Sequence, residues 1–165
     1  MARALSFVVF IVASGLIASC GGAGGGVTDP EGLVRFSVPA GWEVRSEANG
    51  TRLGRIEPAS ERTVLMVAAR PMKEGRTPES VRELSISQIE AQNGELAIDR
   101  MGKRGGVSSW ESLHESPPTS TRPWMHAIHL FPKGLHVEVA LIASPDKYDN
   151  YVPDLETVAD SIKPL

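Results

Sequence analysis

Two histidines, His126 and His129, are the residues of this chain whose type and spacing most directly suggest metal chemistry. On a helix, side chains three positions apart lie on one side, where two imidazoles can hold a zinc ion. The segments WMHAIHLF and LHVEVALIA, separated by PKG, are instead typical of a β-hairpin. Three steps along a strand reverse the face, so we predict that the two histidines point apart and form no metal site. His129 is predicted to face the core with a hydrogen-bond partner.

The serines and acids of the sequence do not form a pattern that is typical of a hydrolase. The motif GxSxG is absent, and Glu111, Leu113 and Glu115 fall on one face of a predicted strand while His114 falls on the other. This arrangement is typical of a solvated strand edge rather than of a general acid and base. We predict a protein that is not an enzyme and has no cofactor; a small envelope hydrolase or a metal-dependent enzyme is the alternative.

The only cysteine, Cys20, lies where an apolar run meets a glycine-rich run. One positive charge at Arg3 precedes the uncharged residues 4–17. Such a run suits an export signal and is shorter than the about 20 residues of a membrane-spanning helix. The tetrapeptide IASC, residues 17–20, resembles the lipobox of bacterial lipoprotein precursors. The resemblance implies that residues 1–19 are a signal peptide, cleaved after Ser19, and that the Cys20 thiol receives a diacylglyceryl group.

The same resemblance makes Cys20 a membrane anchor, because two or three acyl chains, such as palmitate, hold a protein stably at a bilayer. Gly21 follows the cysteine, whereas an aspartate there favours retention in the inner membrane in the resembling proteins. An outer-membrane location is therefore expected if the host has two membranes. Residues 20–32 have no apolar periodicity and are predicted to form a lipidated, flexible, glycine-rich tether. They lack the strand and helix that a phosphate-binding loop requires.

The remaining residues, 33–165, have the length of one compact domain. Removal of residues 1–19 leaves 16 basic against 20 acidic residues, without a cluster of lysine or arginine. This balance excludes nucleic acid from the predicted partners, because nucleic-acid binding needs a basic patch. No cysteine follows Cys20, so disulfides and thiolate metal sites are excluded as well.

Apolar periodicity predicts the order of the elements. Strands are expected over 33–38, 51–58 and 62–71, followed by a helix that Thr77 caps and that ends at 93–94. The packed face of this helix is predicted to hold Val81, Leu84, Ile89 and Ala91. Two strands over 95–101 and 106–116, the hairpin and a helix within 144–165 follow. This order predicts an α+β fold with a mainly antiparallel sheet flanked by helices.

The hairpin is predicted to turn through a three-residue loop, 132–134, with Gly134 in the left-handed conformation. Such a loop pairs Phe131 with Leu135. The pairing places eight residues on one core face: Met125, Ala127, His129, Phe131, Leu135, Val137, Val139 and Leu141.

Four features together resemble the PsbP and Mog1 superfamily: VRFSVPAGWEV at 34–44, the central helix, the late hairpin and the ending YVPDLETVADSIK at 151–163. The resemblance covers about 33–163 and implies an α/β/α sandwich. Members of this superfamily have binding and accessory roles, so the resemblance implies a non-catalytic module for another envelope component. Its motifs concern the fold, and they identify neither a ligand residue nor the protein partner.

The aromatic residues supply a candidate contact surface. Trp42 follows Pro39-Ala40-Gly41 and is predicted to fill the core at the entry of a strand. Trp124, Tyr148 and Tyr151 are predicted to be partly exposed and to contact a protein partner, since Trp and Tyr are enriched at interfaces.

Overall fold

The computed structural model describes residues 26–55, 63–91, 94–115 and 122–165. The predicted signal peptide and Cys20 lie outside these residues. Among the described helices, neither has the length and apolar character needed to cross a membrane.

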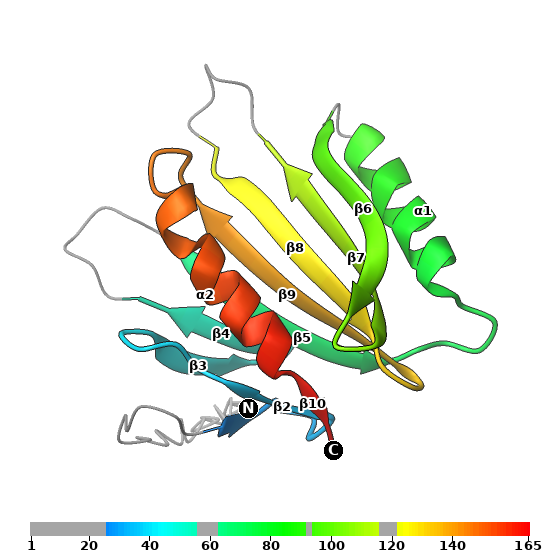
Figure 1. The fold of residues 1–165 in the computed structure, drawn as a ribbon, viewed down its shortest axis with the longest axis horizontal. Coiled ribbons are helices and arrows are strands. Elements are labelled where there is room, and N and C mark those ends of the chain that lie inside the picture. Colours follow the sequence, from blue (N-terminus) through cyan, green and yellow to red (C-terminus); the bar gives the residue numbers. More distant parts are fainter. Residues whose placement is uncertain (1–25, 56–62, 92–93, 116–121) are drawn as a thin grey trace, which may run out of the picture.

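Seven antiparallel strands form the main sheet, in the order β3-β4-β5-β9-β8-β7-β6 (Figure 1). Their bounds are Glu43–Glu47 for β3, Gly50–Gly54 for β4, Val64–Pro71 for β5, Leu96–Arg104 for β6, Val107–His114 for β7, Trp124–Phe131 for β8 and Leu135–Ala143 for β9. The predicted α+β class with a mainly antiparallel sheet is confirmed. β7 lies inside the sheet, so the prediction of a solvated edge around Glu111 is wrong; β6 and β3 are the two edge strands.

Helix α2, Tyr148–Ser161, crosses one face of the sheet over β8 and β9 (Figure 1). It encloses the main core between its apolar face and the sheet. The largest fully buried side chains of this core are Phe36, Leu53, Leu65, Ile128, Leu141 and Leu155. Trp42 is also buried, as predicted.

Helix α1, Pro78–Glu90, contacts β7 near the other end of the sheet. Thr77 caps it as predicted: its hydroxyl accepts from the Ser80 amide, and the Ser80 hydroxyl accepts from the Thr77 amide. The predicted packed face is confirmed for Val81, which is buried, and wrong for Leu84, which is 44% exposed, and for Ala91, which is exposed. The Arg82 guanidinium of the same helix pairs with Asp99 on β6.

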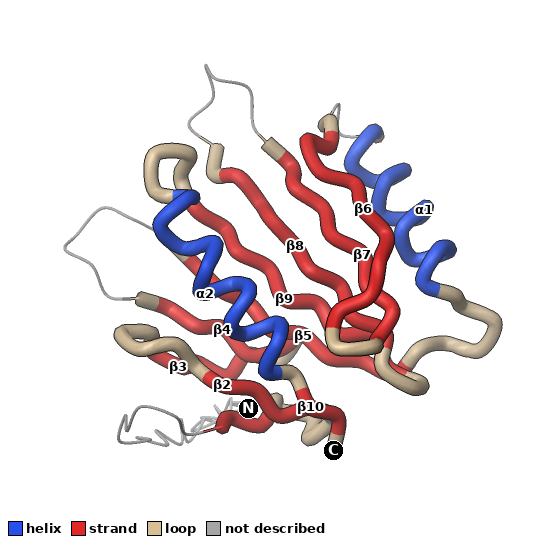
Figure 2. Tube along the Cα trace, in the orientation of Figure 1, coloured by secondary structure: helices blue, strands red, loops and turns tan. Residues whose placement is uncertain are grey.

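A second sheet, in the order β1-β2-β10, joins the two ends of the described chain (Figure 2). Its strands are Gly26–Thr28, Val34–Ser37 and Lys163–Pro164. The predicted tether over 20–32 is therefore wrong from residue 26 onward. Asp29 explains the difference, because its buried carboxylate accepts hydrogen bonds from the amides of Glu31, Leu33 and Val34 and closes the β1–β2 turn.

Replacing Asp29 by alanine is expected to lower the free energy of unfolding by about 2–4 kcal/mol, since three backbone amides lose a charged acceptor at once. Denaturant unfolding followed by circular dichroism measures the loss. Glu31→Ala is the matched control, because this neighbouring carboxylate is exposed and its backbone amide is untouched. Equal stability of the two variants would contradict a structural role for the turn.

The β8–β9 hairpin differs from its predicted register by one residue. The Leu135 amide donates to the Pro132 carbonyl at 2.8 Å, so the loop is the pair Lys133-Gly134, with Gly134 at φ 75°. His126 now lies opposite Leu141, and His129 lies opposite Glu138. The predicted shared core face is therefore wrong, because a slip of one residue exchanges the two faces of a strand. The α2 face carries Trp124, His126, Ile128 and Leu130 from β8, with Val137, Val139 and Leu141 from β9.

Candidate functional site

The predicted contact surface is largely part of the core. Tyr148 is 7% exposed and Tyr151 is 3% exposed, because both lie on the face of α2 that packs on the sheet. Trp124 is half-buried and meets the Tyr148 ring edge to face, with 5.2 Å between the centroids. The prediction of an exposed aromatic surface at Trp124, Tyr148 and Tyr151 is therefore wrong for the two tyrosines.

Tyr148 belongs to a buried polar network that joins α2 to the sheet. Its hydroxyl lies 2.7 Å from His126 Nδ1, and His126 Nε2 lies 3.0 Å from Glu111 Oε1. The other Glu111 oxygen accepts from the Arg100 guanidinium at 2.5 Å. A carboxylate only accepts, so His126 carries its proton on Nε2 and accepts at Nδ1 from the Tyr148 hydroxyl.

The charges of this network are compatible with a structural role. Burial lowers the pKa of His126, although the Glu111 carboxylate acts in the opposite direction. Burial likewise raises the pKa of Tyr148 to about 12, so its hydroxyl keeps its proton and its hydrogen bond. The chain of partners resembles a hydroxyl–imidazole–carboxylate triad, but Tyr148 and His126 are both buried between α2 and the sheet. We assign this network to the docking of α2.

A second histidine cluster lies on the opposite face of the same strands. His129 on β8 stands directly across from Glu138 on β9, and His136 lies two residues before Glu138 on the same face. His129 Nδ1 and His136 Nε2 are 3.0 Å apart, and both side chains are buried. His126 is on the α2 face, so the prediction that His126 and His129 point apart is confirmed.

Arg70 on β5 sets the tautomers of this cluster. Its Nε donates to His136 Nδ1 at 3.2 Å, and its Nη2 lies 3.8 Å from Glu138 Oε2. Because guanidinium only donates, His136 carries its proton on Nε2 and donates to His129 Nδ1. Burial lowers the pKa of His129 to about 3 and that of His136 to about 4, with Arg70 adding repulsion. Burial also raises the pKa of Glu138, partly offset by Arg70.

Aromatic rings hold both imidazoles in place. The Trp110 ring stacks on His129 at 4.5 Å between centroids, and the Phe131 ring stacks on His136 at 5.2 Å. The indole Nε1 of Trp110 donates to Asp99 at 2.9 Å. The same Asp99 carboxylate pairs with the Arg82 guanidinium of α1. The position of α1 is thereby connected to the position of the His129 ring.

The sequence reasoning missed Arg70, His136 and Glu138. The available signal was the alternation in LHVEVAL, where a histidine and a glutamate occupy the positions between the apolar residues. Linking that polar face to His129 requires the correct hairpin register, and linking it to Arg70 requires the pairing of β5 with β9.

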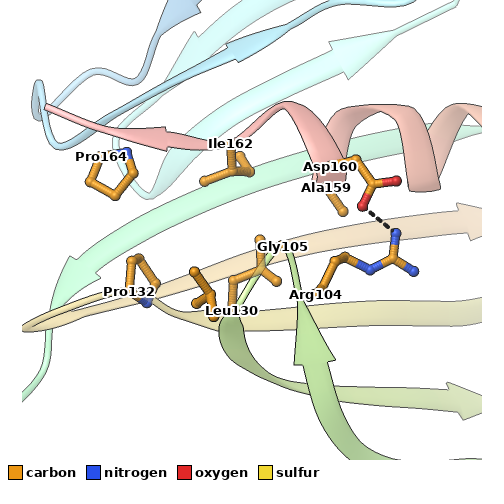
Figure 3. A pocket seen from close by; sticks show the side chains of 9 residues that line it. Arg104, Gly105, Leu130, Pro132, Ala159, Asp160, Ile162 and Pro164 are labelled. Carbon is orange, nitrogen blue, oxygen red and sulfur yellow. Dashed lines mark hydrogen bonds and ion pairs between the residues drawn. The ribbon is translucent and has the colours of Figure 1, made fainter.

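A small pocket lies at the carboxyl end of α2, between β8, β10 and the β6–β7 turn (Figure 3). Apolar side chains form most of its walls, and the Arg104–Asp160 ion pair, at 2.8 Å, borders it. Its volume of about 150 Å³ holds roughly five water-sized groups, at about 30 Å³ each. The pocket therefore has room for one side chain.

Comparison with solved structures places the architecture among known folds. The chain is similar to cyanobacterial PsbP of Synechocystis, with a TM-score of 0.65 and 17% sequence identity, over 90% of this chain and 99% of that chain. The fold is PsbP-like. A scan of protein-family models finds no match, and a search of curated proteins finds no relative.

Two further structures share the fold at low sequence identity. LpqN of Mycobacterium tuberculosis, which is involved in cell envelope biogenesis, matches with a TM-score of 0.64 and 12% identity over 87% of this chain and 86% of that chain. A protein of Bacteroides thetaiotaomicron matches with a TM-score of 0.61 and 11% identity over 87% of this chain, but over 49% of its own length. At these identities the likeness concerns the fold.

Proposed function

We propose that this protein is a lipid-anchored accessory module of the bacterial cell envelope that binds another envelope component without catalysis. The observation that carries the proposal is the IASC segment at the end of an export-type signal, placed directly before a PsbP-like domain. LpqN, which has the same fold and is involved in cell envelope biogenesis, supports an envelope role. Gly21 after the cysteine favours the outer membrane in a host with two membranes.

The anchor would hold the domain close to the lipid. β1 begins at Gly26, so residues 21–25 separate it from Cys20. At about 3.6 Å per residue, a fully extended chain of this length keeps β1 within roughly 20 Å of the acylated residue. A partner of this module is thus expected at the membrane surface, where the small pocket near Arg104 and Asp160 offers an apolar recess for a side chain of that partner.

Replacing Cys20 by alanine is expected to abolish lipid attachment and leave an unprocessed precursor, because the thiol is the acceptor of the lipid. Metabolic labelling with radioactive palmitate, followed by gel electrophoresis, measures both effects. Ser19→Ala is the matched control, since it keeps a small residue before the cysteine and should still be labelled. Equal labelling of the wild type and of Cys20→Ala would contradict the anchor.

In-cell photo-crosslinking tests the binding role. A photoreactive residue replaces Val44 on edge strand β3 in one variant and Met101 on edge strand β6 in another, because both side chains are exposed. A specific envelope protein is expected to be captured from one edge, and capture should decrease when Cys20→Ala removes the anchor. The accessory role is contradicted if neither edge, nor a third probe at Asp160 beside the pocket, captures an envelope component.

A further inference from the structure

The histidine cluster on the face opposite α2 has the composition of a metal site. Small apolar residues, Ala127 and Ala140, occupy the buried positions next to it on the same face. Apolar side chains in these positions would stabilise the fold about as well as the two imidazoles, the carboxylate and the guanidinium do. Stability alone therefore does not explain the cluster. We propose that His129, His136 and Glu138 bind a divalent transition-metal ion of the zinc class.

The separation of the two imidazole nitrogens fits one shared ion. Zinc–nitrogen bonds of about 2.0–2.1 Å place two ligand nitrogens roughly 2.9–3.4 Å apart for angles between 90° and tetrahedral. His129 Nδ1 and His136 Nε2 already lie 3.0 Å apart through their hydrogen bond, and both rings must turn within their planes to direct these nitrogens at one ion. One ligand atom from each of His129, His136 and Glu138 lies within 4.8 Å of the other two. Two imidazoles and one carboxylate are ligands that suit zinc, iron, cobalt and nickel.

The scaffold holds these ligands rigidly and leaves one side accessible. His129 and Glu138 are directly paired on adjacent strands, so β8 and β9 set their spacing. The Trp110 and Phe131 rings fix the planes of the two imidazoles by stacking. The Glu138 side chain is 31% exposed and gives an ion a route from solvent. Three protein ligands leave a fourth position for water or for an external ligand.

Arg70 competes with the ion for this site. Its hydrogen bond keeps the His136 proton on Nε2, which is the nitrogen that must be free to bind metal. Binding therefore moves that proton to Nδ1 and displaces the guanidinium, which also removes a positive charge from the ion's surroundings. The Arg70 side chain is 60% exposed and borders a hollow of about 210 Å³ lined in part by Asp29 and Glu31. It can leave the cluster without unfolding a strand.

Of the two histidines His126 and His129, only His129 belongs to this site. His126 remains on the α2 face, bonded to Tyr148 and Glu111, and takes no part. The ligands come from both strands of one hairpin and meet because of its observed register. The metal site is independent of the lipid anchor and of the accessory role.

The test uses the full chain, produced without a histidine tag and stripped with a chelator. Titration with Co²⁺ is expected to give visible ligand-field absorption that saturates at one ion per chain, and Zn²⁺ is expected to displace it. Zn²⁺ should also raise the melting temperature, because an ion that binds the folded state stabilises it. Absence of both the absorption and the stabilisation would overturn the proposal.

Ligand variants assign the site. Glu138→Gln and His136→Gln are each expected to weaken Zn²⁺ binding by at least about tenfold, with His129→Gln as a third, independent variant. Circular dichroism verifies that each variant folds, and only folded variants are compared. His114→Gln is the matched control, because this histidine of β7 lies outside the cluster and its loss should leave binding unchanged. Wild-type affinity in the folded ligand variants would overturn the assignment.

Arg70→Met gives a result that a purely structural cluster does not produce. It keeps the length of the side chain but removes the donor and the charge. Zn²⁺ affinity is therefore expected to rise by about tenfold or more, because a competing hydrogen bond from a charged donor is no longer broken on binding. The same variant should be less stable than the wild type without metal, since His136 Nδ1 loses its partner. Unchanged or weaker Zn²⁺ binding would overturn the competing role of Arg70.

Discussion

Replacing Trp42 by alanine is expected to lower the free energy of unfolding by about 3–5 kcal/mol, the usual cost of deleting a buried large aromatic side chain. Trp42 is 8% exposed, and its ring meets the Tyr151 ring edge to face at 5.7 Å between centroids. Its indole Nε1 also donates to Asp154 Oδ2 at 2.8 Å. The side chain therefore joins the segment after β2 to helix α2 by packing and by a hydrogen bond.

Two variants separate these contributions in denaturant unfolding followed by circular dichroism. Trp42→Phe keeps much of the apolar surface and removes the donor, so it is expected to cost less than Trp42→Ala. Asp154→Ala removes only the acceptor and should cost about 1–2 kcal/mol, as for one hydrogen bond. A nearly neutral Trp42→Ala would remove this residue from the core and make it a candidate for the binding surface.

Local sequence signals predicted the element order well, because they act within a few residues. Thr77 and Pro78 begin α1 as expected, since capping and the fixed φ of proline depend only on neighbouring backbone. The packed face of α1 was predicted correctly only in part. The side of α1 that contacts the sheet depends on partners in β6 and β7, such as Asp99 for Arg82, which the helix pattern does not contain.

The β8–β9 hairpin was predicted correctly as an element, but the side of the sheet that its β8 residues face was predicted wrongly. Gly134 adopts positive φ as predicted, but the loop has two residues rather than three. PKG is compatible with either loop length, and the difference moves every partner by one position. His129 therefore faces His136 and Glu138 rather than the α2 core.

The positions of the candidate site residues were harder to predict than the order of the elements, because they depend on contacts between segments that are far apart in the sequence. Tyr148 and Tyr151 were expected at the surface, yet the docking of α2 on the sheet buries both. Asp29 was assigned to a tether because GGAGGG lowers the apolar content around it, although its carboxylate closes a turn through contacts as close as two residues away. The sequence feature that indicates this turn is Asp29 itself, because an aspartate carboxylate often accepts hydrogen bonds from backbone amides two or more residues later.

Acidification of the metal-free protein from pH 6.5 to pH 4 is expected to lower its stability progressively. His129 has a pKa of about 3 and His136 of about 4 in the folded state, because burial and Arg70 oppose their protonation. The unfolded chain protonates both near pH 6.5, so below this pH it binds more protons than the folded chain. Each such histidine costs the folded state about 1.4 kcal/mol per pH unit, until its folded pKa is reached.

Other titrating groups change this profile in identifiable ways. Burial lowers the pKa of His126, which adds to the loss in the same direction. Burial raises the pKa of Glu138, so this carboxyl takes up a proton first in the folded state and offsets part of the loss. The hydrogen bond from Arg82 lowers the pKa of Asp99. Burial opposes ionisation of Glu111, but its hydrogen bonds with Arg100 and His126 outweigh burial and lower its pKa. The stabilisation from both carboxylates is therefore lost mainly below pH 4.5.

Denaturant unfolding at several pH values, with a chelator present, measures the slope of stability against pH. His129→Gln is expected to reduce the slope between pH 6.5 and pH 4 by about 1.4 kcal/mol per pH unit, the contribution of one histidine that stays neutral in the folded state. The slope of Glu138→Gln should be steeper than that of the wild type, because this variant removes the opposing carboxyl while leaving both imidazoles in place. A His129→Gln slope equal to that of the wild type would mean that this imidazole takes up its proton in the folded cluster, which is incompatible with a neutral ring buried between Trp110 and His136.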